Sequence, residues 1–125
     1  MIKNKFEGLE VWKEAHKLAI MVYKITKDFP FDERFRLVSQ ICRSVTSIPA
    51  NIVEGNARVH SSEYLQFLNV ARGSLEETRY HLLLAKDLGY LPDSEYEKLI
   101  LQCNIAGNLL GGLIKYLRSH KLPTS

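Results

Sequence analysis

Hydrophobic residues recur at steps of three and four along almost the whole chain, and strand-type alternation is absent. This spacing is that of one face of an α-helix. The pattern forms four segments, which run from about Phe6 to Asp28, Leu37 to Gly55, Ser61 to Gly89 and Ser94 to Leu117. Four helices of roughly 20 to 28 residues joined by short turns predict an all-α fold, an antiparallel up-down-up-down four-helix bundle.

The apolar positions of each segment form the predicted core. In the first segment they are Leu9, Trp12, His16, Ala19, Tyr23 and Thr26, with Ala15, Val22 and Ile25 widening the stripe. In the second they are Leu37, Ile41, Val45, Ile48 and Ile52. In the last two they are Tyr64, Leu68, Ala71, Leu75, Thr78, Leu82 and Ala85, followed by Tyr96, Leu99, Cys103, Ala106, Leu110, Leu113 and Leu117. His16 lies on such a stripe, so we interpret it as a hydrogen-bonded core or interface residue rather than a catalytic base.

Proline and glycine mark the ends and irregularities of the helices. Pro49 lacks an N–H and costs ~3 kcal/mol inside a helix, yet the apolar stripe passes it without losing phase. We therefore predict one second helix that bends at Pro49. Gly55 with Asn56, and later Gly89, are expected to end helices in the left-handed conformation. Ser94 to Glu97 has the pattern of a capping box that starts the fourth helix.

The composition is that of an ordinary globular protein. The chain has 125 residues, of which 46% are hydrophobic and 25% charged. It predicts a single domain over residues 1–125, with frayed ends at about 1–5 and 120–125. No run approaches the length of a membrane span, and the first residues are charged where a signal peptide is apolar. We expect a cytoplasmic protein with two reduced cysteines and no membrane association.

A polar row follows the second helix beside its apolar stripe. Its members are Gln40, Arg43, Ser47, Asn51 and Glu54, and a similar row on the third helix includes Glu76. One interpretation is a solvated face with weak helical ion pairs. The other is a set of fixed hydrogen bonds between helices, between subunits or to a ligand, because amides and hydroxyls are common in the row. We predict Glu76 as the partner of Arg43.

Three stretches of the chain resemble a known family. They are LEVWKEAHKLAIMVYKITKDFP, SIPANIVEG and EYLQFLNVARGSLEE, and the likeness extends from Leu9 to Leu117. They resemble the four-helix bundle family of 23S rRNA intervening-sequence proteins, and also the accessory variability determinant proteins of retroelements, which act beside a reverse transcriptase. The resemblance implies a ring-shaped homo-oligomer, with a pentamer expected, and nucleic-acid contacts. It implies no established enzymatic activity.

Enzymatic patterns are not found. A di-iron bundle needs Glu-x-x-His motifs on facing helices, whereas Glu77 and His81 are four residues apart and no second set accompanies them. The Glu-x-x-Glu spacing of magnesium-binding bundles occurs once, at Glu7 and Glu10. Phosphate-loop and nucleophile-elbow motifs do not occur. We therefore expect no enzyme, no metal and no cofactor.

Basic residues supply the remaining candidate site. Seventeen Lys and Arg against 14 Asp and Glu give a net charge of +3. The better nucleic-acid-binding candidates are Arg58, Arg72 and Arg79, because arginine can bind phosphate with two hydrogen bonds. Lys13, Lys17 and Lys24 are further candidates on one face of the first helix; the other interpretation of that face is an ordinary solvated surface, since Glu10, Glu14 and Asp28 lie in the same region. The leading hypothesis is a non-enzymatic, ring-forming bundle that binds structured RNA or RNA–DNA through repeated basic faces. The alternative is a protein-interaction scaffold, or an accessory subunit of a reverse transcriptase, that does not bind nucleic acid itself.

Overall fold

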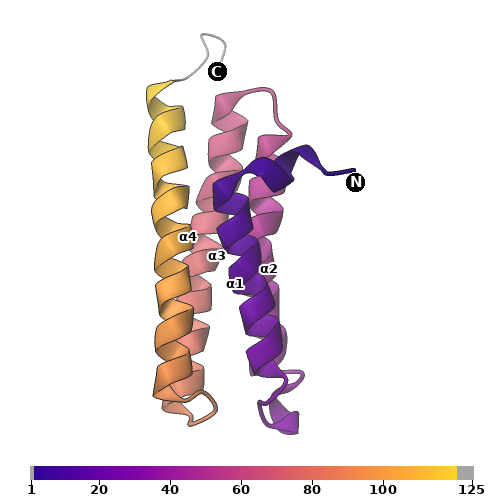
Figure 1. Ribbon diagram of the computed structural model, residues 1–125, viewed down its shortest axis with the longest axis vertical. Helices are drawn as coiled ribbons and strands as arrows, with labels where there is room; N and C mark the ends of the chain where they lie inside the picture. Colours follow the sequence, from indigo (N-terminus) through magenta and orange to yellow (C-terminus); the bar gives the residue numbers. More distant parts are fainter. Residues whose placement is uncertain (1, 121–125) are drawn as a thin grey trace.

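The computed structural model of the protein describes residues 2–120 and contains helices joined by turns, with no strand in that range (Figure 1). Its four α-helices are α1 (Glu10–Thr26), α2 (Leu37–Asn56), α3 (Ser61–Asp87) and α4 (Asp93–Ser119). Two short 3-10 helices, η1 (Lys5–Gly8) and η2 (Phe31–Glu33), precede α1 and α2. The prediction of an all-α chain with four helices is confirmed. The fraying expected at residues 1 and 121–125 lies outside the described residues.

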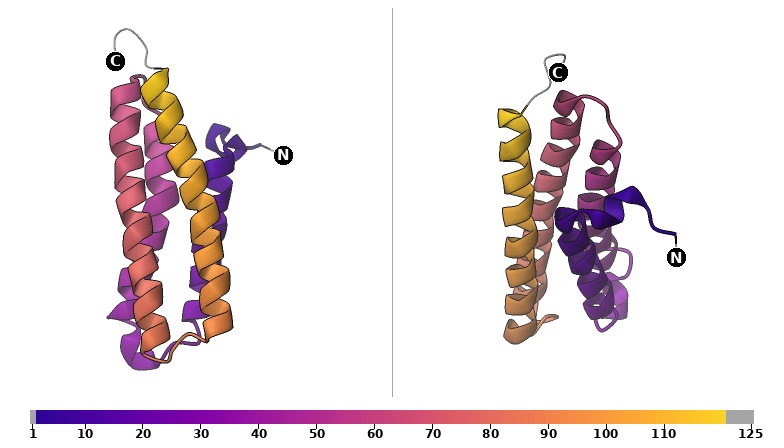
Figure 2. Two further views of the ribbon diagram at one scale, coloured as in Figure 1. Left: turned by 90° about the vertical axis from the view of Figure 1, so that its left-hand side faces the viewer. Right: turned by 45° about the horizontal axis from the view of Figure 1, so that its top comes forward.

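The four helices lie side by side along their lengths (Figures 1 and 2). The α1–α2 and α3–α4 connections lie at one end, and the α2–α3 connection lies at the other end, where α1 begins and α4 ends. Each helix packs on two others, α1 and α3 both on α2 and α4, and the α2–α3 contact is the most extensive. Helices α1 and α3 therefore occupy opposite corners of the bundle. No helix between residues 2 and 120 is both long enough and apolar enough to span a membrane.

The predicted core faces of α2, α3 and α4 are largely buried, whereas the stripe predicted for α1 is buried only in part. The buried residues of α1 are Val11, Ala15, Leu18, Ala19, Val22 and Thr26. His16 is exposed and stacks on Trp12 with ring centroids 4.7 Å apart, and Tyr23 is 49% exposed. Apolar side chains occupy two adjacent faces of α1, and the face with the small residues Ala15 and Ala19 packs inward. His16 is therefore not a core residue.

The two predicted glycine stops behave differently. Gly89 has φ +81°, and the Tyr90 and Gly89 amides donate to the Ala85 and Lys86 carbonyls, at 2.9 and 3.0 Å, as in a Schellman motif. Gly55 instead lies inside α2, which ends at Asn56. It does not adopt the left-handed conformation, because among the described residues only Gly89 has a positive φ. A Cβ on Gly55 would lie 2.8 Å from Cδ1 of Tyr64. Close packing of α2 on α3 therefore explains Gly55.

Helix α2 continues through the buried Pro49, as predicted. The prediction that Ser94 and Glu97 form a capping box at the start of α4 is wrong. Helix α4 begins at Asp93, directly after Pro92, so Ser94 is already helical. Proline fixes φ near the value that suits the start of a helix. Gly107 lies where α4 meets α3, because a Cβ there would be 3.2 Å from a methyl group of Leu75.

Candidate functional site

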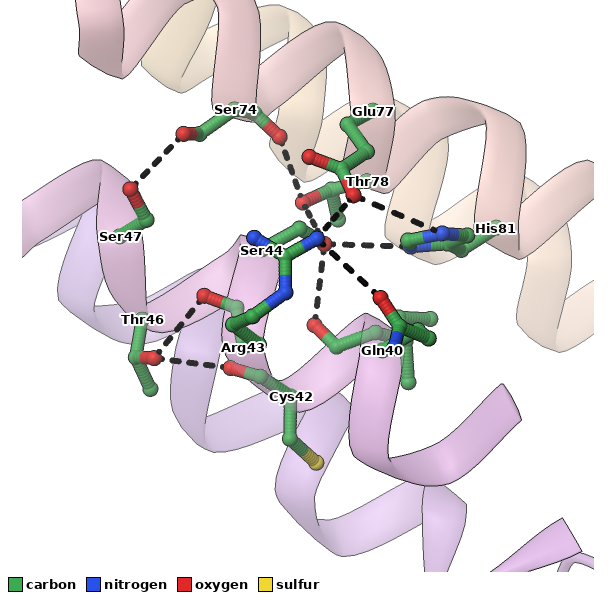
Figure 3. Close-up of polar contacts among 11 residues, drawn as sticks. Gln40, Cys42, Arg43, Ser44, Thr46, Ser47, Ser74, Glu77, Thr78 and His81 are labelled. Atoms are coloured by element: carbon green, nitrogen blue, oxygen red, sulfur yellow. Dashed lines mark hydrogen bonds and ion pairs between the residues drawn. The ribbon is translucent and has the colours of Figure 1, made fainter. Parts of the chain in front are cut away.

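Small hydroxyl groups join α2 to α3 along the middle of the bundle (Figure 3). We call Ser44, Ser47, Ser74, Thr78 and His81 the polar seam. The Ser74 hydroxyl donates to Ser47 at 2.8 Å, and the Thr78 hydroxyl donates to Ser44 at 2.9 Å. Nδ1 of His81 lies 3.2 Å from the Ser44 hydroxyl. Because the serine and threonine side chains are short, they allow α2 and α3 to approach closely at these positions.

An ion pair covers the solvent side of the polar seam. Arg43 pairs with Glu77, not with Glu76 as predicted, and also donates to Gln40 at 3.2 Å. Successive residues of a helix point about 100° apart, so Glu77 faces α2 while Glu76 faces α4. Glu76 instead pairs with Nε of Arg79 at 3.3 Å.

His81 connects the hydroxyls of the polar seam to this ion pair. Its Nε2 lies 3.8 Å from the Glu77 carboxylate, and its side chain is buried. Burial lowers the pKa of His81 below its usual 6.5, Arg43 lowers it further, and Glu77 opposes both. Since the Ser44 hydroxyl contacts both Nδ1 and the Ile41 carbonyl, it can donate to either. The seam can therefore hold the neutral imidazole as a hydrogen-bond acceptor.

Of the remaining residues of the predicted polar row, Asn51 lies at the α2–α3 contact and Glu54 lies in solvent. The Asn51 amide donates to the carbonyl of Ser47 at 2.7 Å and to its hydroxyl at 3.0 Å, so it bonds within α2 beside Pro49. Glu54 is exposed near the end of α2, away from the seam. Gln40, Arg43, Ser47 and Asn51 are thus brought to the α2–α3 contact. Sequence reasoning placed Thr78 only in the apolar core and did not include Ser44, Glu77 or His81 in the row.

A buried carboxylate joins the two connections at the opposite end of the bundle. Glu33 is 6% exposed and accepts hydrogen bonds from the Tyr90 hydroxyl at 2.7 Å and from Arg36 at 3.0 and 3.1 Å. The backbone amide of Leu37, at the start of α2, points to the same carboxylate at 3.5 Å. The Glu-x-x-Arg spacing of Glu33 and Arg36 is visible in the sequence, but nothing there pairs Glu33 with Tyr90.

This arrangement predicts a pH dependence of stability. The Tyr90 hydrogen bond is the largest cause that lowers the pKa of Glu33 below its usual 4.5, and the Leu37 amide and Arg36 act in the same direction. A lowered folded-state pKa stabilises the fold above about pH 4.5, and this stabilisation is lost as the pH falls through the folded-state value. Glu33→Gln should therefore lower the melting temperature at pH 7, and the difference from wild type should shrink toward pH 3. An equal difference at both values would contradict this role.

Beside Glu33, a shallow groove of about 490 Å³ opens between α2 and α3. Tyr80 and Leu84 of α3, with Leu88 directly after this helix, form one side of it. Gln40 of α2, with Arg36 directly before this helix, forms the other. His81 reaches this groove from the polar seam. Within residues 2–120, no group of three His, Cys, Asp or Glu side chains is placed to hold a metal ion.

The basic candidates do not form one surface. Lys13, Lys17 and Lys24 are exposed on α1, with Lys13 3.2 Å from Glu10. Arg72 is exposed on α3, at the opposite corner of the bundle, and donates to Asn69 at 3.0 Å.

The other two arginines have contacts of their own. Arg58 lies over the Phe67 ring, 4.7 Å from its centroid. Arg79 is 27% exposed and donates to Asn104 of α4 at 2.8 Å, besides its pairing with Glu76, so it joins α3 to α4. Arg79 is therefore the least available of these residues for a phosphate.

The fold and the seam define a small all-helical protein with four long helices. Its sequence matches the family model of the 23S rRNA-intervening sequence protein over residues 7–112, and the chain belongs to this family. It is similar to a crystal structure of a protein with unknown function from the S23 ribosomal protein family of Bacteroides thetaiotaomicron VPI-5482. The two are 28% identical with a TM-score of 0.78, over 84% of this chain and 95% of that one. No curated protein matches the chain.

Proposed function

We propose that the protein is a non-enzymatic, self-associating, antiparallel up-down-up-down bundle that binds structured RNA or RNA–DNA in the cytoplasm through the outward face of α1. One observation carries the proposal. Positions 13, 17, 20, 24 and 27 follow one face of α1 at steps of three and four and are all exposed. Four of them are lysines and the fifth is Ile20. We call this row the α1 lysine face.

Of the two acidic residues of α1, Glu10 begins this row and pairs with Lys13 at 3.2 Å, whereas Glu14 lies off it. Glu14 lies on the side toward α4, where its carboxylate and its carbonyl accept hydrogen bonds from Gln102 at 3.0 and 2.9 Å. Glu10 lies in the first turn of α1. Lysines that track a phosphate backbone bind it without reading its sequence. Repetition of the face in a ring, for which we propose five subunits, would add avidity to weak single contacts.

The experiment is a salt titration of binding to a labelled structured RNA. We expect the logarithm of affinity to fall linearly with the logarithm of salt concentration. Lys17→Glu with Lys24→Glu should weaken binding by about tenfold or more and reduce the salt slope by about 1 for each lysine. The matched control is Arg72→Glu with Lys98→Glu, which changes the net charge equally but lies on α3 and α4.

Two results would overturn the proposal in different ways. If the control pair weakens binding as much as the α1 pair, net charge rather than the α1 lysine face is responsible. If wild-type protein does not bind at about 50 mM salt, where phosphate contacts are strong, the RNA hypothesis fails. Circular dichroism of each variant tests whether the helices remain folded.

A second candidate function is a scaffold for protein partners, such as a reverse transcriptase, with no direct contact to nucleic acid. The apolar side chains on the solvent side of α4 favour it, since exposed contiguous apolar patches mark interaction sites. Leu101 is 61% exposed and Tyr116 is 56% exposed. A stable oligomer that ignores RNA at every salt concentration and co-purifies with a protein would favour this candidate.

A further inference from the structure

A row of aromatic rings runs beside the α1 lysine face. Its members are Trp12, His16 and Tyr23, and we call them the α1 aromatic row. Each directly precedes a lysine of the face, so each ring points about 100° around the helix from its lysine. His16 is exposed and stacks on the half-buried Trp12, and Tyr23 is 49% exposed. Helix α1 therefore presents flat rings and cations side by side along its length.

The α1 aromatic row leads to the end of the bundle where α1 is joined to α2 (Figure 1). A hollow of about 350 Å³ opens there, and we call it the α1–α2 hollow. Tyr23 lines it from α1, Lys27 lines it directly after this helix, and Cys42 lines it from α2. The chain between the two helices contributes Phe31 and Arg34. Because Lys27 also belongs to the α1 lysine face, the hollow is continuous with that face.

The chemistry of the α1–α2 hollow suits an aromatic group that carries a negative charge. Phe31 is 74% exposed, and the Arg34 guanidinium lies over its ring, 4.6 Å from the centroid. The charged residues that line the hollow are Lys27 and Arg34, both positive. Aromatic rings and arginine planes are the surfaces on which proteins stack unpaired bases, and a positively charged groove beside them follows the phosphates.

The acidic residues near the α1–α2 hollow do not line it. Asp28 and Asp32 are exposed on the chain between the two helices, and neither is among the lining residues. Glu33 is buried, with its carboxylate held by Tyr90 and Arg36, and it lines the groove between α2 and α3 instead. The hollow itself therefore favours an anionic ligand over a cationic one.

We propose that unpaired nucleotides of the bound RNA stack on the α1 aromatic row, and that one base enters the α1–α2 hollow. The base stacks there against Tyr23 and Phe31. The phosphates beside it contact Lys27 and Arg34. This inference rests on the proposed function and names the part of the RNA that the α1 lysine face recognises. Because a base within a duplex is already stacked on its neighbours, the site selects loops, bulges and ends.

The test compares two forms of one labelled RNA at the same salt concentration. A hairpin with a single-stranded tail is measured alone and again after a complementary strand has been annealed to the tail. We expect the tailed hairpin to bind at least about fivefold more tightly, which is the effect of one stacked base. Annealing adds phosphates, so electrostatic attraction alone predicts the opposite order.

Tyr23→Ala with Phe31→Ala removes two rings of the hollow without changing the charge. This variant should bind the tailed hairpin about fivefold or more weakly than wild type does. Its binding to the annealed form and its salt slope should be unchanged, because the slope counts phosphate contacts. The matched control is Tyr80→Ala with Tyr116→Ala, whose rings are 60% and 56% exposed on α3 and α4. Circular dichroism checks the fold of both variants.

Cys42 reports on the α1–α2 hollow in the unaltered protein. Its thiol is half-buried, whereas Cys103 is fully buried and burial raises the pKa of Cys103 to about 11. Burial also raises the pKa of Cys42, so alkylation by N-ethylmaleimide is followed at mildly alkaline pH, where more thiolate forms. Peptide mass spectrometry identifies the modified cysteine. The tailed hairpin should slow alkylation of Cys42, and the annealed form should not.

The outcomes separate this inference from the function on which it rests. If both RNA forms bind equally, or if the Tyr23 and Phe31 variant binds the tailed hairpin as wild type does, the inference is wrong and the α1 lysine face remains. If the tailed hairpin is preferred but leaves alkylation of Cys42 unchanged, the base does not enter the hollow and the assigned site is wrong. If neither form binds at about 50 mM salt, the proposed function itself fails.

Discussion

Gly55→Ala should lower the free energy of unfolding by about 1–3 kcal/mol, the range for adding a methyl group to a tightly packed site. The added Cβ would lie 2.8 Å from Cδ1 of Tyr64 and 3.0 Å from Cβ of Phe67. The Tyr64 ring can rotate, but Cβ of Phe67 moves only with the backbone of α3. The clash therefore outweighs the gain of about 1 kcal/mol that alanine normally brings to a helix. Urea unfolding monitored by circular dichroism measures the change.

Gly73→Ala is the matched control for this substitution. Gly73 is exposed within α3, and a Cβ there would meet nothing within 4 Å. The same change should raise the free energy of unfolding by up to about 1 kcal/mol, through helix propensity alone. If Gly55→Ala were also stabilising, the close approach of α2 and α3 at Gly55 would not constrain the sequence.

Ser44→Ala should cost about 1–3 kcal/mol, because it leaves Nδ1 of the buried His81 without its hydrogen-bond partner. Thr78 keeps its bond to the Ser74 carbonyl at 2.8 Å, so the loss centres on His81. Ser44→Ala combined with His81→Phe should cost less than the two single changes added together, since both polar partners are then removed. A double-mutant cycle in urea measures this coupling. Additive costs would show that the two side chains do not depend on each other.

The same histidine should make stability depend on pH. Its pKa is lowered in the fold, so below pH 6.5 the unfolded chain binds a proton that the folded chain does not. Stability should therefore fall as the pH drops from 7 toward 5. His81→Phe should flatten this part of the profile. An unchanged slope in that variant would assign the pH dependence to other groups.

Helix periodicity was sufficient to predict the four helices and most of the core, because the core of α2, α3 and α4 is a single apolar stripe on each. It was right only in part for α1, where apolar residues occupy two adjacent faces. The spacing placed Ala15, Ala19 and Val22 in the core correctly, but it also included the exposed His16 and Tyr23 and omitted the buried Leu18. Small side chains that permit close packing were the better indication.

The polar contacts were harder to predict, because they depend on how two helices are rotated against each other. The polar row on α2 was identified, but Arg43 pairs with Glu77 and not Glu76, which is a difference of one position and about 100°. Ser44 and Thr78 are both fully buried, but Thr78 was assigned to the apolar stripe and Ser44 to neither predicted row. The Glu33–Tyr90 bond joins residues 57 positions apart, and no local pattern indicates such a pairing.

Because the chain crosses the length of the bundle four times, α1 begins and α4 ends beside the α2–α3 connection (Figure 1). The other end carries Glu33 and Tyr90, and there the Arg34 guanidinium lies 4.6 and 4.8 Å from the ring centroids of the exposed Phe31 and Phe35. A ring of parallel copies would therefore have two chemically different rims, one with η1 and the end of α4, the other with aromatic rings and arginines. Such an assembly has a direction, and a partner that recognises one rim would attach in a single orientation.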